Sequence, residues 1–192
     1  WETARGLDPA NGRDAELDPD RDGITNLAEF NGETDPALSD GPAQIVDIIG
    51  GTTLVENSAN KLSLIYDVSD GNANLSGLGI RLHFSSAVVD TVDFDNVLAV
   101  DLLAVDNIAR QDYYDFDNDW RTDSYVAAAW ASTAAGSDAM WPGSLPRKLL
   151  DVTLNLKAEL GGTQEMPLKL SASDTSIGYR FSGEPVYSRV IA

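Results

Sequence analysis

From Ala43 onward, the chain consists of short runs in which apolar and polar residues alternate. In residues 61–68 the apolar positions recur at every second residue from Leu62 to Val68, and residues 149–156 repeat this pattern. A period of two places successive side chains on opposite faces of an extended chain and predicts half-buried β-strands. Further strands are expected over residues 45–49, 78–84, 88–94, 125–130, 166–170, 179–181 and 186–191.

Turn-forming residues such as Asp70-Gly71 separate these runs, and helices do not alternate regularly with strands. Residues 96–105 are expected to include a helical turn or two. About eight or nine strands joined by turns are typical of an antiparallel β-sandwich, so the predicted fold class is all-β.

Residues 1–41 differ in composition, because they are rich in Asp, Gly, Asn and Pro and hold few large apolar side chains. Gly41-Pro42 is a natural break in the chain. We therefore expect two parts, a segment over residues 1–41 and a sandwich over residues 42–192.

The formal net charge is −18, and most of it lies in two segments. Residues 1–41 and residues 90–123 each carry a net charge of −8, which leaves −2 for the other 117 residues. Carboxylates crowded in this way repel one another unless cations lie among them. A solvated acidic surface is the alternative interpretation. Nucleic acid is not expected as a partner, because phosphate binding needs clustered Lys and Arg.

The absence of cysteine excludes disulfides and thiolate metal sites. No apolar run approaches the roughly 18 residues that span a bilayer, so membrane insertion is not expected. Trp1-Glu2 shows neither the charged start nor the apolar stretch of a signal peptide, as expected of a mature protein or an excised fragment. If the protein is secreted, something other than disulfides must brace its loops.

Residues 18–29 match the twelve-residue EF-hand calcium loop at every ligand position, with Gly23 where the loop turns sharply. The expected ligands are side-chain oxygens of Asp18, Asp20, Asp22, Asn26 and Glu29 and the backbone carbonyl of Ile24. Residues 13–17 are too short and polar for the first helix of a full EF-hand, so ligation should organise this segment as much as packing does. An Asp-rich linker is the alternative.

The motifs Gly6-Leu-Asp-Pro9, the loop 18–29 with the following Phe30, and Gly32-Glu-Thr-Asp-Pro36 resemble the bacterial thrombospondin type 3-like calcium repeat over residues 1–41. Glu33 interrupts the usual Gly-Thr-Asp-Pro. The resemblance implies a secreted or cell-surface protein, in which such repeats often serve as spacers. It also implies further calcium ligands at Asp8, Asp14, Asp35 and Asp40.

Residues 112–123 form a second segment of alternating carboxylates, which can wrap a cation, and Ca²⁺ is expected here as well. Trp120 stands where a calcium loop has its glycine, so the geometry must differ from that of an EF-hand. The rival interpretation is a solvated loop whose aromatic side chains pack on the sandwich. The expected ligands are Asp115, Asp117, Asp119 and Asp123, with Asp112 as a further candidate.

Residues 43–192 resemble the cohesin-like family in the order of their motifs: Leu78-Gly-Ile-Arg-Leu-His-Phe84, then Val126-Ala-Ala-Ala-Trp130, then the amphipathic pair 149–156 and 167–170. The resemblance implies a jelly-roll-like sandwich of about nine strands. It also implies attachment to a protein partner or self-association rather than catalysis.

An enzyme is not expected. His83, the only histidine, alternates out of phase with the apolar residues of its strand, which predicts a surface position, and no Gly-x-Ser-x-Gly elbow accompanies it. The sequence thus predicts a non-catalytic, extracellular or cell-surface calcium-binding attachment module. The alternative is a calcium-dependent carbohydrate-binding module that binds a polysaccharide by aromatic stacking. The candidate platform residues are Tyr113, Tyr114, Trp120, Tyr125, Trp130 and Trp141.

Overall fold

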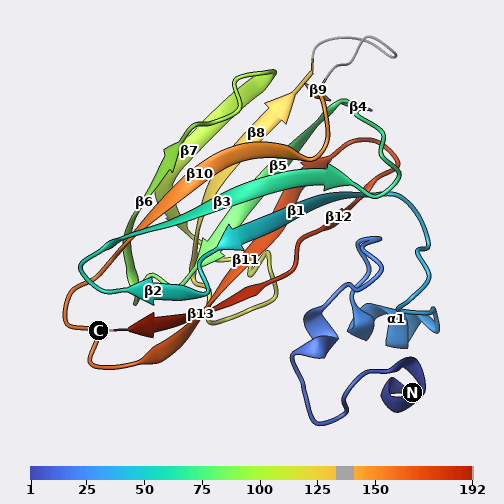
Figure 1. The fold of residues 1–192 in the computed structure, drawn as a ribbon, viewed down its shortest axis with the longest axis horizontal. Helices are drawn as coiled ribbons and strands as arrows, with labels where there is room; N and C mark the ends of the chain where they lie inside the picture. The colour runs from blue at the N-terminus through green and yellow to red at the C-terminus, as the bar shows by residue number, and fades with distance from the viewer. Residues whose placement is uncertain (133–140, 192) are drawn as a thin grey trace.

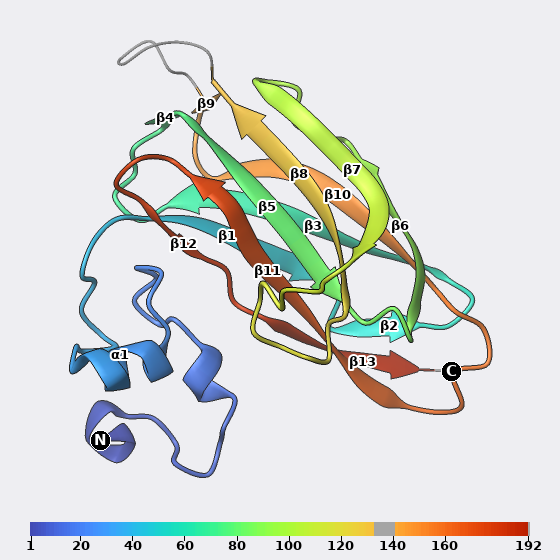
Figure 2. The same cartoon turned by 180° about the vertical axis from the view of Figure 1, so that it is seen from behind.

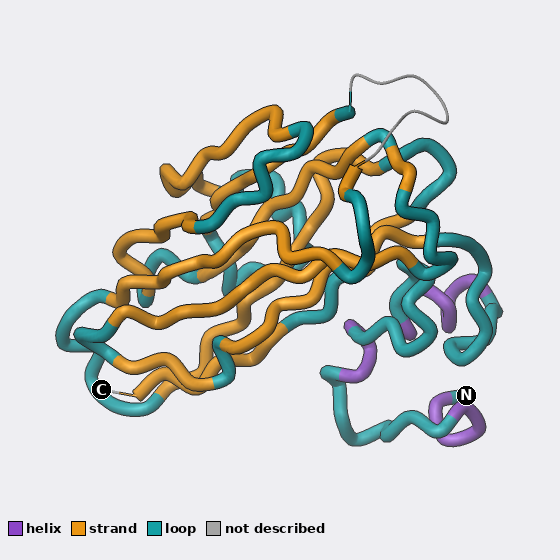
Figure 3. Tube along the Cα trace, turned by 45° about the horizontal axis from the view of Figure 1, so that its top comes forward, coloured by secondary structure: helices purple, strands orange, loops and turns teal. Residues whose placement is uncertain are grey.

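The computed structural model describes residues 1–132 and 141–191. Two β-sheets face each other and form most of the molecule, and the N-terminal residues lie to one side of them (Figures 1 and 2). In the described residues, helical turns are confined to this N-terminal part (Figure 3). They are η1 (Glu2–Arg5), η2 (Asp14–Glu16) and α1 (Asn26–Gly32).

The first sheet has five strands, in the spatial order β12 (Arg180–Ser182), β1 (Ala43–Gly50), β3 (Ala59–Val68), β10 (Arg147–Leu156) and β6 (Val89–Asp95). All neighbours are antiparallel except β1 and β12. In β3 the alternate residues from Leu62 to Val68 are buried, as their period of two predicts.

The second sheet has six strands, in the spatial order β2 (Thr53–Val55), β13 (Val186–Ile191), β11 (Gln164–Thr175), β5 (Gly77–Phe84), β8 (Ser124–Ala131) and β7 (Leu102–Gln111). Here β2 and β13 are parallel and the other neighbours antiparallel. The helical turn expected within residues 96–105 is wrong, because residues 96–101 form a loop without helix and residues 102–105 begin β7 and pair with β8.

A two-stranded ribbon of β4 (Asn74–Leu75) and β9 (Trp141–Pro142) lies at one end of the sandwich (Figure 1). The described residues thus hold thirteen strands, more than the expected nine, because several strands are only two or three residues long. The prediction of an all-β, largely antiparallel sandwich is confirmed.

The core lies between the sheets and is apolar. The first sheet contributes alternate residues of β10 from Leu150 to Leu156, and the second contributes alternate residues of β5 from Leu78 to Phe84. Each such side chain contributes about 1.5–3 kcal/mol when it leaves water. No residue of the segment 1–41 belongs to this cluster, so the sandwich has a core of its own.

Polar contacts hold the N-terminal segment against the sandwich. Arg21 forms an ion pair with Asp47 of β1 at 2.5 Å. Glu16 accepts a hydrogen bond from the Tyr187 hydroxyl of β13 at 2.6 Å. In residues 1–132 and 141–191, no helix is both long and apolar enough to cross a bilayer.

Candidate functional site

The loop that precedes α1 has the turn that its glycine predicts. Gly23 has φ +87°, in the left-handed region that suits a residue without a Cβ. A Cβ at this position would lie 2.5 Å from the Cβ of Arg180 and 2.9 Å from the carbonyl oxygen of Phe181. Glycine is therefore required twice, for the turn and for the close approach of the loop to β12.

Asp18 and Asp22 hold the loop in shape through backbone hydrogen bonds. The N–H of Asp22 donates to one oxygen of Asp18 at 3.2 Å, and the N–H of Ile24 donates to one oxygen of Asp22 at 2.8 Å. The other oxygen of Asp22 accepts from the N–H of Asp40 at 2.6 Å and from Arg180 at 3.2 Å. The loop is thereby tied to the chain that follows it and to β12.

Four other side-chain oxygens of this loop are buried and make no hydrogen bond. They are both carboxylate oxygens of Asp20, Oδ1 of Asn26 and Oε2 of Glu29, whose side chain is 0% exposed. Leaving one buried polar atom without a partner costs about 1–3 kcal/mol, and more if it is charged. One oxygen each of Asp18, Asp20 and Asp22 lies within 4.8 Å of the other two. A single cation can contact these three Asp oxygens, whereas Glu29 lies outside the group of acidic ligand atoms within 4.8 Å of one another.

Crowding of the carboxylates changes their protonation. Burial, together with the negative charge of Asp22, raises the pKa of Asp20 to about 6. Burial, followed by the charges of Asp20 and Asp22, raises the pKa of Glu29 to about 7. Without a cation, the loop therefore carries its full negative charge only at a free-energy cost near neutral pH.

The remaining acidic candidates of the first segment do not gather into another site. Asp35 forms an ion pair with Arg5. Asp8 and Asp40 are exposed, and Asp14 accepts a hydrogen bond from the N–H of Asp8 at 3.0 Å. Within the described residues these four carboxylates belong to no group of ligand atoms closer than 4.8 Å.

The four carboxylates expected to share a cation in the second acidic segment are not brought together. Asp115 is exposed. The two oxygens of Asp123 accept from the N–H and the hydroxyl of Ser86, both at 2.6 Å. Asp119 forms an ion pair with Arg121 at 2.6 Å. The expected alternation is present in the sequence, but Asp119 and Asp123 bind other neighbours and Asp115 is exposed.

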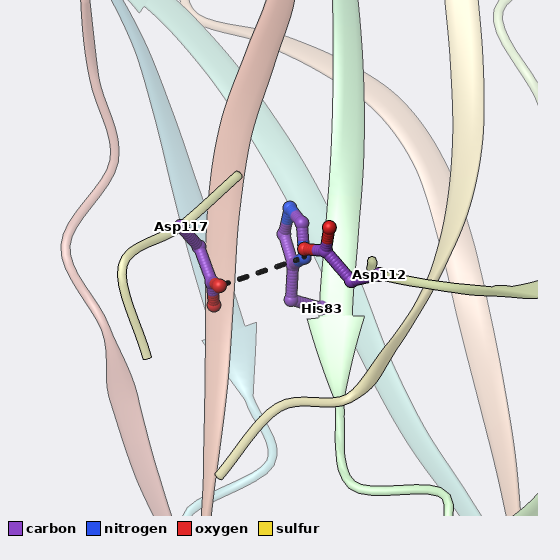
Figure 4. A group of neighbouring side chains, drawn as sticks. All are labelled: His83, Asp112 and Asp117. Atoms are coloured by element: carbon purple, nitrogen blue, oxygen red, sulfur yellow. Dashed lines mark ion pairs between the residues drawn. The ribbon is translucent and has the colours of Figure 1, made fainter. Parts of the chain in front are cut away.

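Asp117, the fourth member, faces His83 of β5 instead. His83 is 0% exposed, so the predicted surface position is wrong. The phase of the alternation was right, because His83 lies on the outer face of the second sheet, but the loop between β7 and β8 covers it. Nδ1 of His83 lies 3.1 Å from Oδ2 of Asp112 and 3.8 Å from Oδ1 of Asp117 (Figure 4). Burial lowers the pKa of His83 to about 4.

Ser171, His83 and Asp112 lie in the order of a hydrolytic triad, with Ser171 Oγ 2.7 Å from His83 Nε2. Two features of a working triad are missing. Nδ1 of His83 makes no hydrogen bond to Asp112, and the imidazole is enclosed where a substrate cannot reach it. A non-catalytic role stays the prediction.

The aromatic residues expected to form a sugar platform fall into two groups. Trp130 and Trp141 are buried, so neither can stack on a sugar. The exposed members are Tyr113, Tyr114 and Trp120, and Tyr125 is half-buried. The platform is therefore smaller than predicted and lies on the loop between β7 and β8. The rival interpretation of this loop is wrong for these three exposed rings but holds for Phe116, whose ring lies edge-on to Tyr125 of β8 with centroids 5.9 Å apart.

No family model matches the chain, and no curated protein does. Among solved structures, it is similar to the sixth cohesin of Acetivibrio cellulolyticus scaffoldin B, solved in complex with a Cel5 dockerin, at 10% identity and a TM-score of 0.47 over 78% of this chain and 98% of that one. It is also similar to the cohesin CaCohA2 of Clostridium acetobutylicum, at 9% identity and a TM-score of 0.46 over 79% of this chain and 92% of that one. A third similar structure is the cohesin module of a Clostridium perfringens family 33 glycoside hydrolase, at 14% identity and a TM-score of 0.38 over 78% of this chain and 96% of that one. This likeness concerns the β-sandwich fold and says nothing about ligands or partners.

Proposed function

We propose that this chain is a non-catalytic, extracellular calcium-binding module that attaches to a protein partner or to another copy of itself. One Ca²⁺ lies in the loop 18–29. The observation that supports this site is the set of buried, unpartnered oxygens of Asp20, Asn26 and Glu29, which stand at three ligand positions of a calcium loop.

Calcium in this loop braces the N-terminal segment on the sandwich. Asp22, a ligand, also binds Arg180 of β12, and its neighbour Arg21 binds Asp47 of β1. If free Ca²⁺ is about 100 to 1,000 times the dissociation constant, the ion adds about 2.7–4.1 kcal/mol to stability. That is a large share of the roughly 5–15 kcal/mol typical of a folded protein. The ion thus does what disulfides do in other secreted proteins.

Strand β7 supports the attachment role. It forms one edge of the second sheet and is exposed along almost its whole length. Leu103 and Ile108 on this strand are 70% and 76% exposed. An edge strand offers unpaired backbone groups to another chain, and exposed apolar side chains add contact area.

Calorimetric titration of the metal-free protein with Ca²⁺ tests the metal site. We expect one site in the loop 18–29, and Glu29→Gln should weaken it by at least about tenfold. Glu33→Gln is the matched control, because Glu33 is an exposed acid just beyond α1 and should leave the affinity unchanged. Absence of binding heat at millimolar Ca²⁺ would overturn the calcium proposal.

Light scattering and capture experiments test attachment. The wild-type protein in Ca²⁺ is expected to self-associate or to retain a protein partner, and Ile108→Lys should abolish this. Ile49→Lys is the control, because Ile49 is exposed on β1, away from this edge. A calcium-loaded monomer that captures nothing contradicts the attachment role but leaves the metal site standing.

Carbohydrate binding is the second candidate, and Trp120 favours it. This ring is 86% exposed and stands beside a cleft of about 380 Å³ that Gln164 and Glu165 also line. An exposed ring next to polar side chains suits stacking and hydrogen bonding to a sugar. Binding isotherms on a glycan panel test this candidate with Trp120→Ala as the variant. Failure to bind any polysaccharide removes it.

A further inference from the structure

His83 is the centre of a second cluster, separate from the loop 18–29. The imidazole projects from the outer face of β5, where its cross-strand neighbours are Lys169 of β11 and Tyr125 of β8. Asp112 and Asp117 reach it from the loop between β7 and β8, and the three side chains point toward one another (Figure 4). A sheet residue and two loop residues therefore meet beneath the loop.

Two atoms at the centre of this cluster have no hydrogen-bond partner although they are buried. One is Nδ1 of His83, which lies 3.1 Å from Oδ2 of Asp112 without forming a hydrogen bond to it. The other is Oδ1 of Asp117, whose side chain is only 1% exposed. In the tautomer with its hydrogen on Nε2, the lone pair of Nδ1 faces the carboxylate oxygens with nothing between them, and a cation bound there would satisfy these atoms.

The other atoms of the same side chains are held in place. Ser171 bonds the Nε2 atom of His83 at 2.7 Å, which orients the ring. The Thr122 hydroxyl donates to Oδ2 of Asp117 at 2.6 Å. The N–H of Phe116 donates to Oδ2 of Asp112 at 3.0 Å. Outer contacts that fix each ligand in this way are typical of metal sites.

No Lys or Arg side chain of the described residues neutralises the carboxylates of this cluster by direct contact. Among the described residues, no Lys or Arg nitrogen lies within 4.0 Å of the carboxylates of Asp112 or Asp117. The charge of Lys169 is felt at Asp117, but its ammonium group lies 3.4 Å from Glu16 and is shared with other acids. Two carboxylates thus face one imidazole without a neighbouring positive charge in contact.

We propose that His83 Nδ1, Asp112 Oδ2 and Asp117 Oδ1 bind a divalent first-row transition metal ion such as Zn²⁺. An ion with bonds of about 2.0–2.2 Å holds its ligand atoms about 3.0–3.5 Å apart, close to the observed 3.1 and 3.8 Å. Imidazole nitrogen suits such ions, whereas Ca²⁺ prefers oxygen ligands alone and in larger number.

Of the three ligands, Asp117 also lines a cavity of about 530 Å³, together with Lys169 and with Glu16 of the N-terminal segment. Three protein ligands leave at least one position on the metal for water. Bound there, the ion clamps the loop between β7 and β8 onto β5 and orders the exposed aromatic residues that this loop carries.

The single histidine makes the test direct, because the imidazole region of a ¹⁵N NMR spectrum contains one residue. The calcium-saturated protein is titrated with Zn²⁺. We expect the Nδ1 signal to shift at one equivalent while Nε2 stays protonated, and Ca²⁺ alone to leave Nδ1 unmoved. Asp117→Asn should lower the Zn²⁺ affinity at least about tenfold. Asp115→Asn, an exposed carboxylate on the same loop, should leave it unchanged.

An Nδ1 signal that is unaffected by a molar excess of Zn²⁺ overturns the proposal, and this measurement needs no variant. Equal loss of affinity in Asp117→Asn and Asp115→Asn also overturns it, because general loss of acidic charge would then explain the binding. Neither result bears on the calcium site, which is saturated throughout.

Discussion

The two acidic regions of this chain carry the same net charge of −8, in residues 1–41 and in residues 90–123, but they accommodate it differently. In the loop 18–29, both carboxylate oxygens of Asp20 and Oε2 of Glu29 are buried and unpartnered. In the loop between β7 and β8, Asp123 accepts a hydrogen bond from Ser86, and Asp119 forms an ion pair with Arg121. Charge density alone therefore does not define a metal site. What matters is whether the fold supplies donors for the carboxylates that it buries.

The largest expected effect comes from removing a calcium ligand. Asp20→Ala or Glu29→Ala should abolish calcium binding and with it about 2.7–4.1 kcal/mol of stabilisation of residues 1–41. The sandwich should stay folded, because its core includes none of these residues. Limited proteolysis at millimolar Ca²⁺ checks this, with cleavage expected in the first 41 residues. Unchanged protease resistance of that segment would count against the calcium brace.

Gly23→Ala should have the next largest effect. The backbone at this position has φ +87°, which disfavours any residue with a Cβ, and the new Cβ would also collide with Arg180 and Phe181. Both the turn and the contact of the loop with β12 would therefore be strained. Strain of this kind costs about 1–3 kcal/mol. Calcium affinity, measured by calorimetry, should fall by about tenfold or more. Gly12→Ala is the control, because a Cβ at Gly12 meets nothing within 4 Å; equal effects of the two variants would refute the geometric argument.

A smaller effect is expected from pH. The metal-free loop holds Asp20 and Glu29 at pKa values of about 6 and about 7, above their ordinary values of 3.8 and 4.5. Because the folded loop binds these protons more tightly than the unfolded chain, the metal-free segment is most stable in acid and loses stability as pH rises through 6 and 7. Calcium must displace the same protons.

Calcium affinity should therefore be about tenfold lower near pH 6 than near pH 8. Calorimetry in buffers of different ionisation enthalpy should also detect proton release near pH 6 to 7 when Ca²⁺ binds. An affinity that is flat across this range, with no proton release, would show that the two carboxylates are not ligands.

The smallest effect is expected from a substitution in the second acidic region. Asp115→Asn removes a charge from this region, but Asp115 is exposed and is a proposed ligand neither of the calcium ion nor of the transition metal ion. Thermal unfolding should change by less than about 0.5 kcal/mol, as for most surface substitutions. Calcium stoichiometry should not change. A lost equivalent of calcium would mean that the second region binds this ion after all.

The sandwich was predictable because its strands bury one face each. The period of two in residues 61–68 and 149–156 depends only on burial against a core, and β3 and β10 follow it. The turn at Gly23 was predictable for a related reason, since the loop 18–29 is defined by the spacing of twelve consecutive residues, and its calcium ion stays a prediction. Local spacing is sufficient where local geometry decides the structure.

The His83 cluster was not predictable, because His83 lies on β5 whereas Asp112 and Asp117 lie on the loop after β7, with β6 and β7 between them in the chain. The alternation of β5 gave the correct face for His83 but not its cover, since nothing in residues 78–84 reports that a distant loop folds over them. Likewise, the spacing of Asp115, Asp117 and Asp119 predicted one shared cation, although Arg121 and His83 draw these side chains apart.

A crystal structure grown in millimolar Ca²⁺, with anomalous scattering to identify the ion, tests the central claim most directly. We expect one Ca²⁺ within about 2.3–2.6 Å of oxygens from Asp18, Asp20, Asp22, Asn26 and Glu29 and of the carbonyl oxygen of Ile24. A well-ordered loop with no ion between these oxygens would contradict it.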